Sequence, residues 1–173
     1  MTDGLKYKNV FLVGFMGAGK TTVGRLLAEK TGYEYLDADE VIEKNAGKSI
    51  TQIFADHGED YFRDLETQSL KSLAAQQNHV IATGGGVVMR EENWQAMKSG
   101  GVTVYLKAPI EVIWERIKHS TTRPLLQVEN PLETARELLG RRESMYQKAD
   151  LIVDTEHLSA QGATDELLKS LKS

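Results

Sequence analysis

Near the amino terminus, the segment GFMGAGKT (residues 14–21) follows an apolar run, 10–13, and precedes a stretch in which Val23, Leu26 and Leu27 recur at helical spacing. It fits the pattern G-x-x-x-x-G-K-[ST], whose glycines let backbone N–H groups turn toward phosphate oxygens. The helix that follows directs its positive end at the same phosphates. A strand, this loop and a helix in that order predict a parallel α/β fold that binds a nucleotide.

Two side chains at the end of this loop carry chemistry. Lys20 supplies a mobile charge for the β- and γ-phosphates, and Thr21 offers an oxygen to Mg²⁺. The alternative is a glycine turn with an exposed lysine, although a chance match in a chain of this size is expected on the order of one per cent of the time. Motors, switches and kinases all use such loops, so the motif leaves the reaction open.

Apolar and amphipathic segments alternate along the rest of the chain. Strands are predicted at 10–13, 33–36, 79–82, 102–106 and 151–153. Helices are predicted at 20–30, around 41–42, at 49–58, 59–77 and 93–98, from Pro109, and at 131–148 and 159–171. The alternation predicts an α/β sandwich around a mostly parallel sheet. No linker or repeat divides residues 1–173, so we expect a single domain.

Composition excludes several classes of protein. The net charge of −4 argues against a nucleic-acid binder, and the absence of cysteine excludes disulfides and thiolate metal sites. The four histidines lack the spacing of metal ligands. A polar amino-terminal segment and the lack of an apolar run of about 18 residues predict a cytoplasmic protein.

Two aspartates, Asp37 and Asp39, follow the second predicted strand. Ligands of open parallel sheets bind outside the carboxyl ends of the strands. Carboxylates there either hold Mg²⁺ through water or accept a proton from an attacking hydroxyl. The alternative is that Asp39 only caps the helix that carries Val41 and Ile42.

Arginines supply candidate anion-binding groups. Arg63 lies three residues before Glu66, so a carboxylate on the same helix face can orient its guanidinium. The alternative is a surface ion pair that contributes little to stability. Of Arg141 and Arg142, one is expected to face the cleft and the other the solvent. Arg123 lies in a long polar loop, 119–130, which has the character of a lid that excludes water and neutralises charge.

A second glycine-rich loop, residues 84–86, follows the predicted strand 79–82. Consecutive glycines allow bare backbone to approach a ligand closely. The alternative is a flexible turn without contact to a ligand.

Together these segments resemble the shikimate kinase family. The motifs GFMGAGKTT, LDADEVIE, GEDYFRDLE, ATGGGVV, TTRPLL and RRESMYQKAD occur in the family's order and at similar spacing, between about residues 10 and 154. The resemblance implies a three-layer α/β sandwich of the P-loop kinase type with a five-stranded parallel sheet. It also implies a substrate-binding region at about 38–66 and a lid loop at about 119–130.

The resemblance implies transfer of a phosphoryl group from ATP to the 3-hydroxyl of shikimate with Mg²⁺ as cofactor. The implied ATP-binding residues are Gly17, Ala18, Gly19, Lys20, Thr21, Thr22, Arg116 and Arg123. The implied substrate-binding residues are Asp39, Arg63, Gly84, Gly85, Gly86 and Arg142. Thr21 and Asp37 are the implied metal ligands, and Asp39, Lys20 and Arg123 the implied catalytic residues. Arg142 is preferred to Arg141 because it precedes Tyr146 by four residues, as in the family's R-x-x-x-Y.

Two other functions remain open on the sequence. Another small-molecule kinase of this fold, such as a gluconate or nucleotide kinase, would use a different acceptor. A P-loop switch would hydrolyse ATP slowly without any acceptor. We further expect small-molecule partners, no nucleic acid or membrane, and a monomer.

Overall fold

The structure is a computed structural model that describes residues 4–119 and 127–173. Its strands are β1 (Asn9–Val13), β2 (Glu34–Asp37), β3 (His79–Ala82), β4 (Val102–Lys107) and β5 (Leu151–Asp154). Its helices are α1 (Lys20–Thr31), α2 (Ala38–Ala46), α3 (Ile50–Ala74), α4 (Glu91–Gly100), α5 (Ile110–Ile117), α6 (Pro131–Tyr146) and α7 (Ala160–Lys172), with a short 3₁₀ helix, η1 (Val87–Met89). Strands and helices alternate as the sequence predicts.

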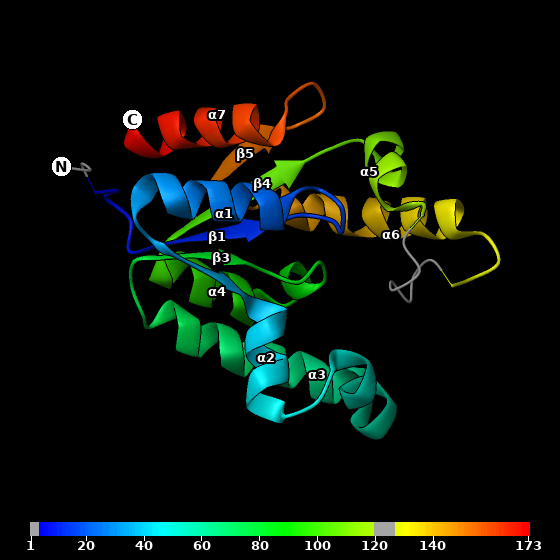
Figure 1. Cartoon of the computed structure of the whole chain (residues 1–173). Helices are drawn as coiled ribbons and strands as arrows, with labels where there is room; N and C mark the ends of the chain where they lie inside the picture. The colour runs from blue at the N-terminus through cyan, green and yellow to red at the C-terminus, as the bar shows by residue number, and fades with distance from the viewer. Residues whose placement is uncertain (1–3, 120–126) are drawn as a thin grey trace.

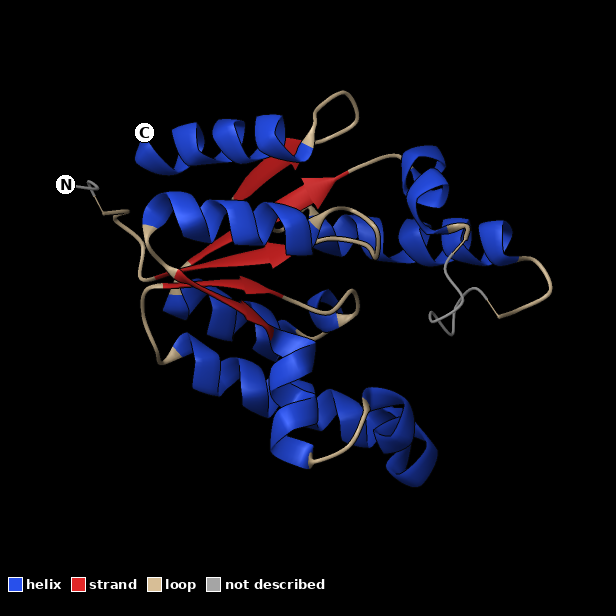
Figure 2. Cartoon of the chain, in the orientation of Figure 1, coloured by secondary structure: helices blue, strands red, loops and turns tan. Residues whose placement is uncertain are grey.

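The strands form one parallel sheet in the order β2-β3-β1-β4-β5. β3 therefore lies between β1 and β2, and its last residue, Ala82, is in register with Leu12 of β1 and Asp37 of β2. The segments that follow these three strands leave the sheet at the same edge (Figure 2). The predicted parallel α/β fold with five strands is confirmed.

The sheet is covered by helices on both faces, as Figure 1 shows. Successive residues of β1 point to opposite faces: Val10 and Leu12 pack in one hydrophobic cluster with residues of α1 and α7, and Phe11 and Val13 pack in another with residues of α3, α4, α5 and α6. Burying each such side chain stabilises the fold by roughly 1.5–3 kcal/mol relative to exposure. β1 is buried on both faces because it lies at the centre of this sandwich.

The helix α2 and the first part of α3 extend away from the sheet (Figure 1) and share a small core formed by Ile42, Ile53 and Phe62. Gly58 interrupts α3 with a φ of 83° and a ψ of 175°, a conformation that is essentially restricted to glycine. The sequence predicts two helices that meet at Gly58, and the break lies there. The second part ends at Ala74 rather than at residue 77.

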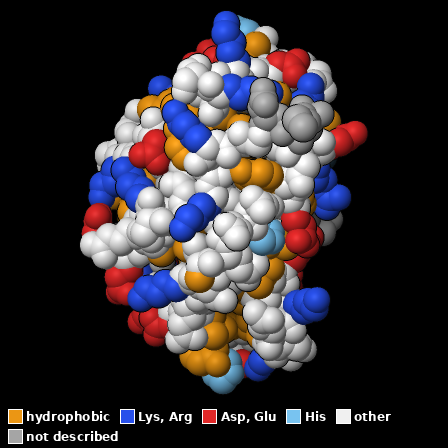
Figure 3. Space-filling model, turned by 90° about the vertical axis from the view of Figure 1, so that its left-hand side faces the viewer, with side chains coloured by type: hydrophobic (Ala, Val, Ile, Leu, Met, Phe, Trp, Pro, Cys, Tyr) orange, Lys and Arg blue, Asp and Glu red, His pale blue; other side chains and the backbone are white. Residues whose placement is uncertain are grey.

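Figure 3 shows the face at the amino ends of the strands, where basic and acidic side chains are interspersed. Among the described helices, none combines the length and the apolar character needed to cross a bilayer.

Candidate active site

The two glycine-rich loops lie side by side because β1 and β3 are neighbours in the sheet. Thr83, at the end of β3, binds the carbonyl of Leu12 through both its hydroxyl (2.8 Å) and its N–H (3.1 Å). A Cβ placed on Gly85 would lie 3.9 Å from the carbonyl oxygen of Gly14. A ligand held by the first loop therefore lies beside the second.

The first loop has the geometry of a phosphate-binding loop. Gly17 and Gly19 adopt φ angles of 78° and 101°, which disfavour other residues. A Cβ on Gly17 would also lie 2.6 Å from the side chain of Ile117. Gly19 precedes α1 and provides no side-chain cap, so the first-turn N–H groups remain available to an anion. Lys20 Nζ donates to the carbonyl of Gly14 across the loop.

The expectation that Asp39 caps α2 is wrong, because Asp37 occupies that position. Asp37 Oδ1 accepts hydrogen bonds from the N–H groups of Asp39 (2.9 Å) and Glu40 (3.2 Å). The two aspartates are separated by one residue, so either satisfies the sequence preference for a cap. Because Asp37 caps the helix, the Asp39 carboxylate has no capping role.

The Asp39 carboxylate lies in an unfavourable place for a negative charge. Its Oδ1 is buried and has no hydrogen-bond partner among the described residues. Burial raises the pKa of Asp39 from 3.8 to about 6, the carboxylates of Glu66 and Asp37 add to this rise, and Lys20 opposes it. A carboxylate with a pKa close to neutral is suited to act as a general base.

Arg63 is held by two carboxylates on its own helix. Its Nη1 lies 3.0 Å from Glu66 Oε1 and its Nη2 lies 3.5 Å from Glu59 Oε1. The alternative of a surface ion pair does not describe the first contact, because the Glu66 side chain is only 4% exposed. Burial raises the pKa of Glu66, and Arg63 counteracts part of that rise. The guanidinium is therefore fixed in direction before any ligand binds.

The structure separates Arg141 from Arg142. Arg141 is 74% exposed and pairs only loosely with Glu137, at 3.8 Å. Arg142 faces the second glycine loop, where a Cβ on Gly85 would lie 3.0 Å from its Nη1. Of the two arginines, Arg142 is therefore the one whose guanidinium lies against the glycine loop, and its role in binding stays a prediction.

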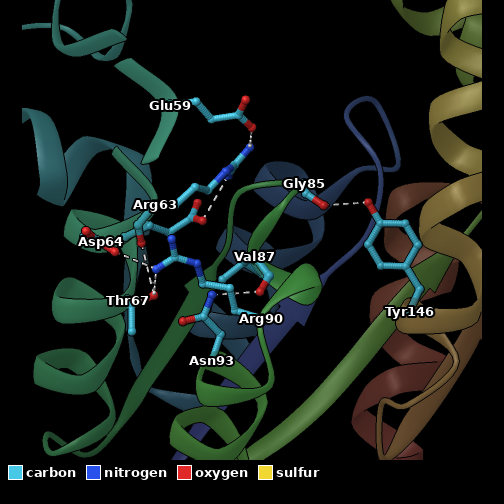
Figure 4. A network of polar contacts seen from close by, with 10 residues as sticks. Glu59, Arg63, Asp64, Thr67, Gly85, Val87, Arg90, Asn93 and Tyr146 are labelled. Atoms are coloured by element: carbon cyan, nitrogen blue, oxygen red, sulfur yellow. Dashed lines mark hydrogen bonds and ion pairs between the residues drawn. The ribbon is translucent and has the colours of Figure 1, made fainter. Parts of the chain in front are cut away.

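Each glycine of the second loop faces a charged side chain. A Cβ on Gly84 would lie 3.0 Å from Glu66 Oε2 and 3.1 Å from Asp39 Oδ1. A Cβ on Gly86 would lie 2.7 Å from both terminal nitrogens of Arg63. Any side chain at 84–86 would displace these groups, so the alternative of a merely flexible turn does not account for the three glycines. The loop lies between Arg63 and Tyr146 in Figure 4.

One cavity of about 640 Å³ connects the two loops. Its lining includes Lys20, Thr21, Thr22, Asp37, Asp39, Gly84, Gly85 and Arg116. A second cavity of about 360 Å³ adjoins Gly86 and is lined by Arg63, Arg90, Arg141 and Arg142 among others. A further cavity of about 430 Å³ between α2 and α3 is lined by none of the phosphate-loop residues, so it is separate from the candidate active site.

A carboxy-terminal segment lies beside Arg116 at the phosphate loop. Arg116 donates to the carbonyl of Gly17 (2.9 Å). Arg116 also lines a cavity of about 300 Å³ with Thr22 and residues of the segment 155–163. That segment carries no recognisable motif, and only its position beside the loop identifies it. Arg123, the predicted lid residue, lies outside the described residues.

The donor set at the first loop fits Mg²⁺. The ion prefers oxygen ligands and binds through one or two carboxylates together with substrate phosphates. Thr21 and Asp37 line the same cavity beside the phosphate loop. Among residues 4–119 and 127–173, no cluster of three or more acidic, histidine or cysteine side chains forms a separate metal site.

Comparison with known proteins agrees with this geometry. A sequence profile of the shikimate kinase family matches residues 16–172. The chain belongs to the shikimate kinase family. The shikimate kinase of Thermodesulfovibrio yellowstonii is 49% identical over 162 residues, which are 94% of each chain. The crystallised shikimate kinase of Acinetobacter baumannii in complex with shikimate matches with a TM-score of 0.90 at 41% identity and covers 96% of this chain and 93% of that one.

The gluconate kinase alternative receives support only at the level of the fold. A gluconokinase from Sinorhizobium meliloti matches with a TM-score of 0.63 at 21% identity. The shikimate kinases share both the fold and the sequence with this chain. The predicted family, fold and enzyme class are therefore confirmed.

Proposed function

We propose that this protein transfers the γ-phosphoryl group of ATP to the 3-hydroxyl of shikimate, giving shikimate 3-phosphate and ADP for aromatic amino acid synthesis. The observation that carries the proposal is the cavity that joins the phosphate loop to Asp39 and the second glycine loop. Donor and acceptor then meet in one space. Catalysis of phosphoryl transfer depends on such positioning and on charge neutralisation.

The donor binds at the first loop. The backbone of Gly17, Ala18 and Gly19 and the side chain of Lys20 surround its phosphates. Arg116 and the segment 155–163 border its base, as their shared cavity supports. Arg123 is assigned to the lid over the phosphates on the sequence alone.

Mg²⁺ supplies charge neutralisation between the phosphates when it is bound with ATP. Thr21 and Asp37 are the proposed ligands, with Asp37 acting through water. Thr22 lies next to Thr21 at the start of α1 and completes the phosphate site.

The acceptor binds at the second loop. Arg63 and Arg142 bind the carboxylate of shikimate, because planar guanidinium groups suit a carboxylate. Both face the loop 84–86 and line the cavity beside Gly86, and the bare backbone of the loop leaves room for a ring. Asp39 accepts hydrogen bonds from the shikimate hydroxyls.

Asp39 is also the proposed general base. Its Oδ1 is buried and has no hydrogen-bond partner in the part of the chain that the structure describes, and its pKa is raised. Both properties suit a group that takes the proton of the 3-hydroxyl as the oxygen attacks phosphorus. Lys20 and Arg123 neutralise the charge on the transferring group. The predictions of a monomer, of a cytoplasmic location and of no nucleic-acid partner stay predictions.

The test is ADP formation from Mg-ATP with shikimate, with gluconate, with AMP and without any acceptor. ADP that forms only with shikimate, together with a phosphorylated product, is the expected result. Turnover with another acceptor instead would leave the phosphate site standing and refute the acceptor. Equal ADP formation without an acceptor would favour the switch.

A further inference from the structure

The second glycine loop directs its carbonyl groups into the protein. The carbonyls of Gly84 and Gly86 accept from the N–H groups of Val87 and Met89, both at 3.2 Å, within the turn that forms η1. Among the described residues, no acceptor takes a hydrogen bond from the three glycine N–H groups. These N–H groups therefore remain available as donors to a ligand.

The carbonyl of Gly85 differs from the other two because its partner is distant in sequence. The hydroxyl of Tyr146 donates to it at 2.8 Å, across 61 positions of the chain. Figure 4 shows the Tyr146 ring directed from α6 at this oxygen, on the opposite side of the loop from Arg63. This contact determines which way the peptide between Gly85 and Gly86 faces.

A trans peptide directs its C=O and N–H in opposite directions, and the described chain contains no cis peptide bond. When the Gly85 carbonyl faces Tyr146, the N–H of Gly86 faces away from it, toward the side where Arg63 lies. Glycine has few steric barriers to rotation of such a peptide. Something outside the loop must therefore hold the orientation.

We propose that Tyr146 is a positioning residue, whose hydroxyl holds the Gly85–Gly86 peptide with its N–H toward the acceptor before shikimate binds. The inference rests on the proposed acceptor site. The hydroxyl acts through the loop and not on the reacting atoms. Without it the peptide rotates, and the loop loses a preorganised donor.

Tyr146 is itself rigidly held, as a positioning residue requires. Its ring is fully buried and stacks on Tyr105, with centroids 4.9 Å apart and an angle of 16° between the planes. Asp150, just after α6, binds both the N–H and the hydroxyl of Thr103 in β4 at 2.9 Å. These contacts fasten the end of α6 to the sheet.

The hydroxyl remains a donor throughout the working pH range. Burial raises the pKa of Tyr146 to about 12. The carboxylate of Glu143 adds to this rise, and the neighbouring guanidinium of Arg142 opposes it. A protonated phenol donates to a carbonyl, as the geometry requires.

Tyr105 provides a matched control. It is buried to the same degree and belongs to the same ring stack, but its hydroxyl donates to Glu143 at 2.6 Å. Among the described residues, no hydrogen bond joins this hydroxyl to the loop. Tyr146→Phe and Tyr105→Phe each remove one buried hydroxyl and keep the ring. A merely structural role predicts the same kinetic effect for both.

The expected result is a rise in KM for shikimate of about 3- to 10-fold in Tyr146→Phe, the equivalent of one neutral hydrogen bond, with KM for ATP unchanged. Tyr105→Phe should keep both constants at the values of the unaltered enzyme. Unchanged KM for shikimate in Tyr146→Phe, or an equal rise in both variants, overturns the inference.

Amide resonances of the loop provide the direct measurement. In ¹⁵N spectra, Tyr146→Phe should shift and broaden the Gly86 amide, and Tyr105→Phe should not. A raised KM with an unchanged Gly86 amide would assign the effect to Arg142 instead and overturn the inference.

The unaltered enzyme gives an independent result if Tyr146→Phe does not fold. A loop that Tyr146 holds should show a single sharp Gly86 amide without shikimate and no relaxation dispersion. Dispersion that vanishes when shikimate is added would mean that the substrate orders the loop, against the proposal. Absence of shikimate turnover in the unaltered enzyme would refute the proposed function, whereas turnover without a Tyr146 effect refutes only this inference.

Discussion

Among single residues, Asp39 has an environment that favours its proposed role as a base and lowers the stability of the fold. Its carboxylate is buried near Glu66 and Asp37, and its Oδ1 lacks a hydrogen-bond partner among the described residues. Burial without compensation destabilises a charged group. The same burial brings the pKa close to the range in which a general base works best.

Replacement of Asp39 by Asn should therefore lower kcat and raise stability. The expected loss in kcat is about 10²- to 10⁴-fold, typical of a removed general base. The folded-state pKa is raised from 3.8 to about 6, so the stability contributed by Asp39 is present below about pH 4 and is lost as the pH rises through 6. At pH 8, Asp39→Asn should be more stable than the unaltered protein by up to about 3 kcal/mol.

Urea unfolding at pH 4 and pH 8 measures this difference, which should disappear at the lower pH. In the unaltered enzyme, kcat/KM for shikimate should also fall as the pH drops below about 6, because Asp39 becomes protonated. A stability difference between Asp39→Asn and the unaltered protein that is the same at pH 4 and pH 8 would contradict the assigned pKa.

The neighbouring arginines Arg141 and Arg142 allow a paired test on one helix. Arg142→Ala removes a charged donor that faces the glycine loop, so KM for shikimate should rise about 10- to 100-fold. Arg141→Ala removes an exposed side chain and should leave KM for shikimate unchanged. Steady-state kinetics with each substrate varied in turn measures both KM values. An equal rise in KM for shikimate in the two variants would contradict the assignment of Arg142 to the acceptor site.

Within the helices, replacement by alanine of two glycines with open surroundings should change the free energy of unfolding in opposite directions. A Cβ at Gly58 or at Gly140 would meet no atom within 4 Å, so only the backbone conformation matters. Gly58 breaks α3 at a φ of 83°, and Gly140 lies within α6. Gly58→Ala should lower the free energy of unfolding by about 1–3 kcal/mol, and Gly140→Ala should raise it by about 0.5–1 kcal/mol.

Denaturant titration measures both changes. A stabilising Gly58→Ala would show that α3 tolerates a continuous helix across residue 58. Because α3 carries Arg63 five residues after Gly58, such a helix would also alter the direction of its guanidinium.

The elements also show the limits of the sequence as a guide. Helix and strand positions follow from local periodicity, and Gly58 was placed correctly because glycine interrupts helices by its own conformational preference. The cap of α2 was misassigned between Asp37 and Asp39, because both have the required chemistry and only the backbone path separates them. Tyr146 carries a clear spacing signal, four residues after Arg142, but its partner Gly85 is 61 positions away.

In the whole molecule, the order of the strands in the sheet brings the parts of the candidate site together. β3 is inserted between β1 and β2, so loops that are separated by tens of residues in the sequence meet at one edge of the sheet. Local patterns predict a parallel sheet but contain no information about which strands are neighbours. The resemblance to a family assigned the two loops to donor and acceptor without a strand order, and the observed order brings the loops together at one cavity.

Because the cavity at the phosphate loop and the cavity lined by Arg63 and Arg142 meet at the loop 84–86, each substrate should stabilise the whole fold through its own set of residues. Shikimate or Mg-ADP at about 100 times its dissociation constant should raise the free energy of unfolding by about 2.7 kcal/mol. For a chain of this length, that corresponds to a rise in Tm of roughly 5–10 °C.

Two variants should dissociate these shifts in opposite directions. Arg142→Ala should lose most of the shift caused by shikimate and keep that caused by Mg-ADP, because Arg142 faces the second loop. Lys20→Ala should lose the Mg-ADP shift and keep the shikimate shift, because Lys20 belongs to the phosphate loop. Thermal melts of both variants with each ligand make the comparison. If either variant lost both shifts, the two loops would not bind their ligands separately, and the division into donor and acceptor loops would fail.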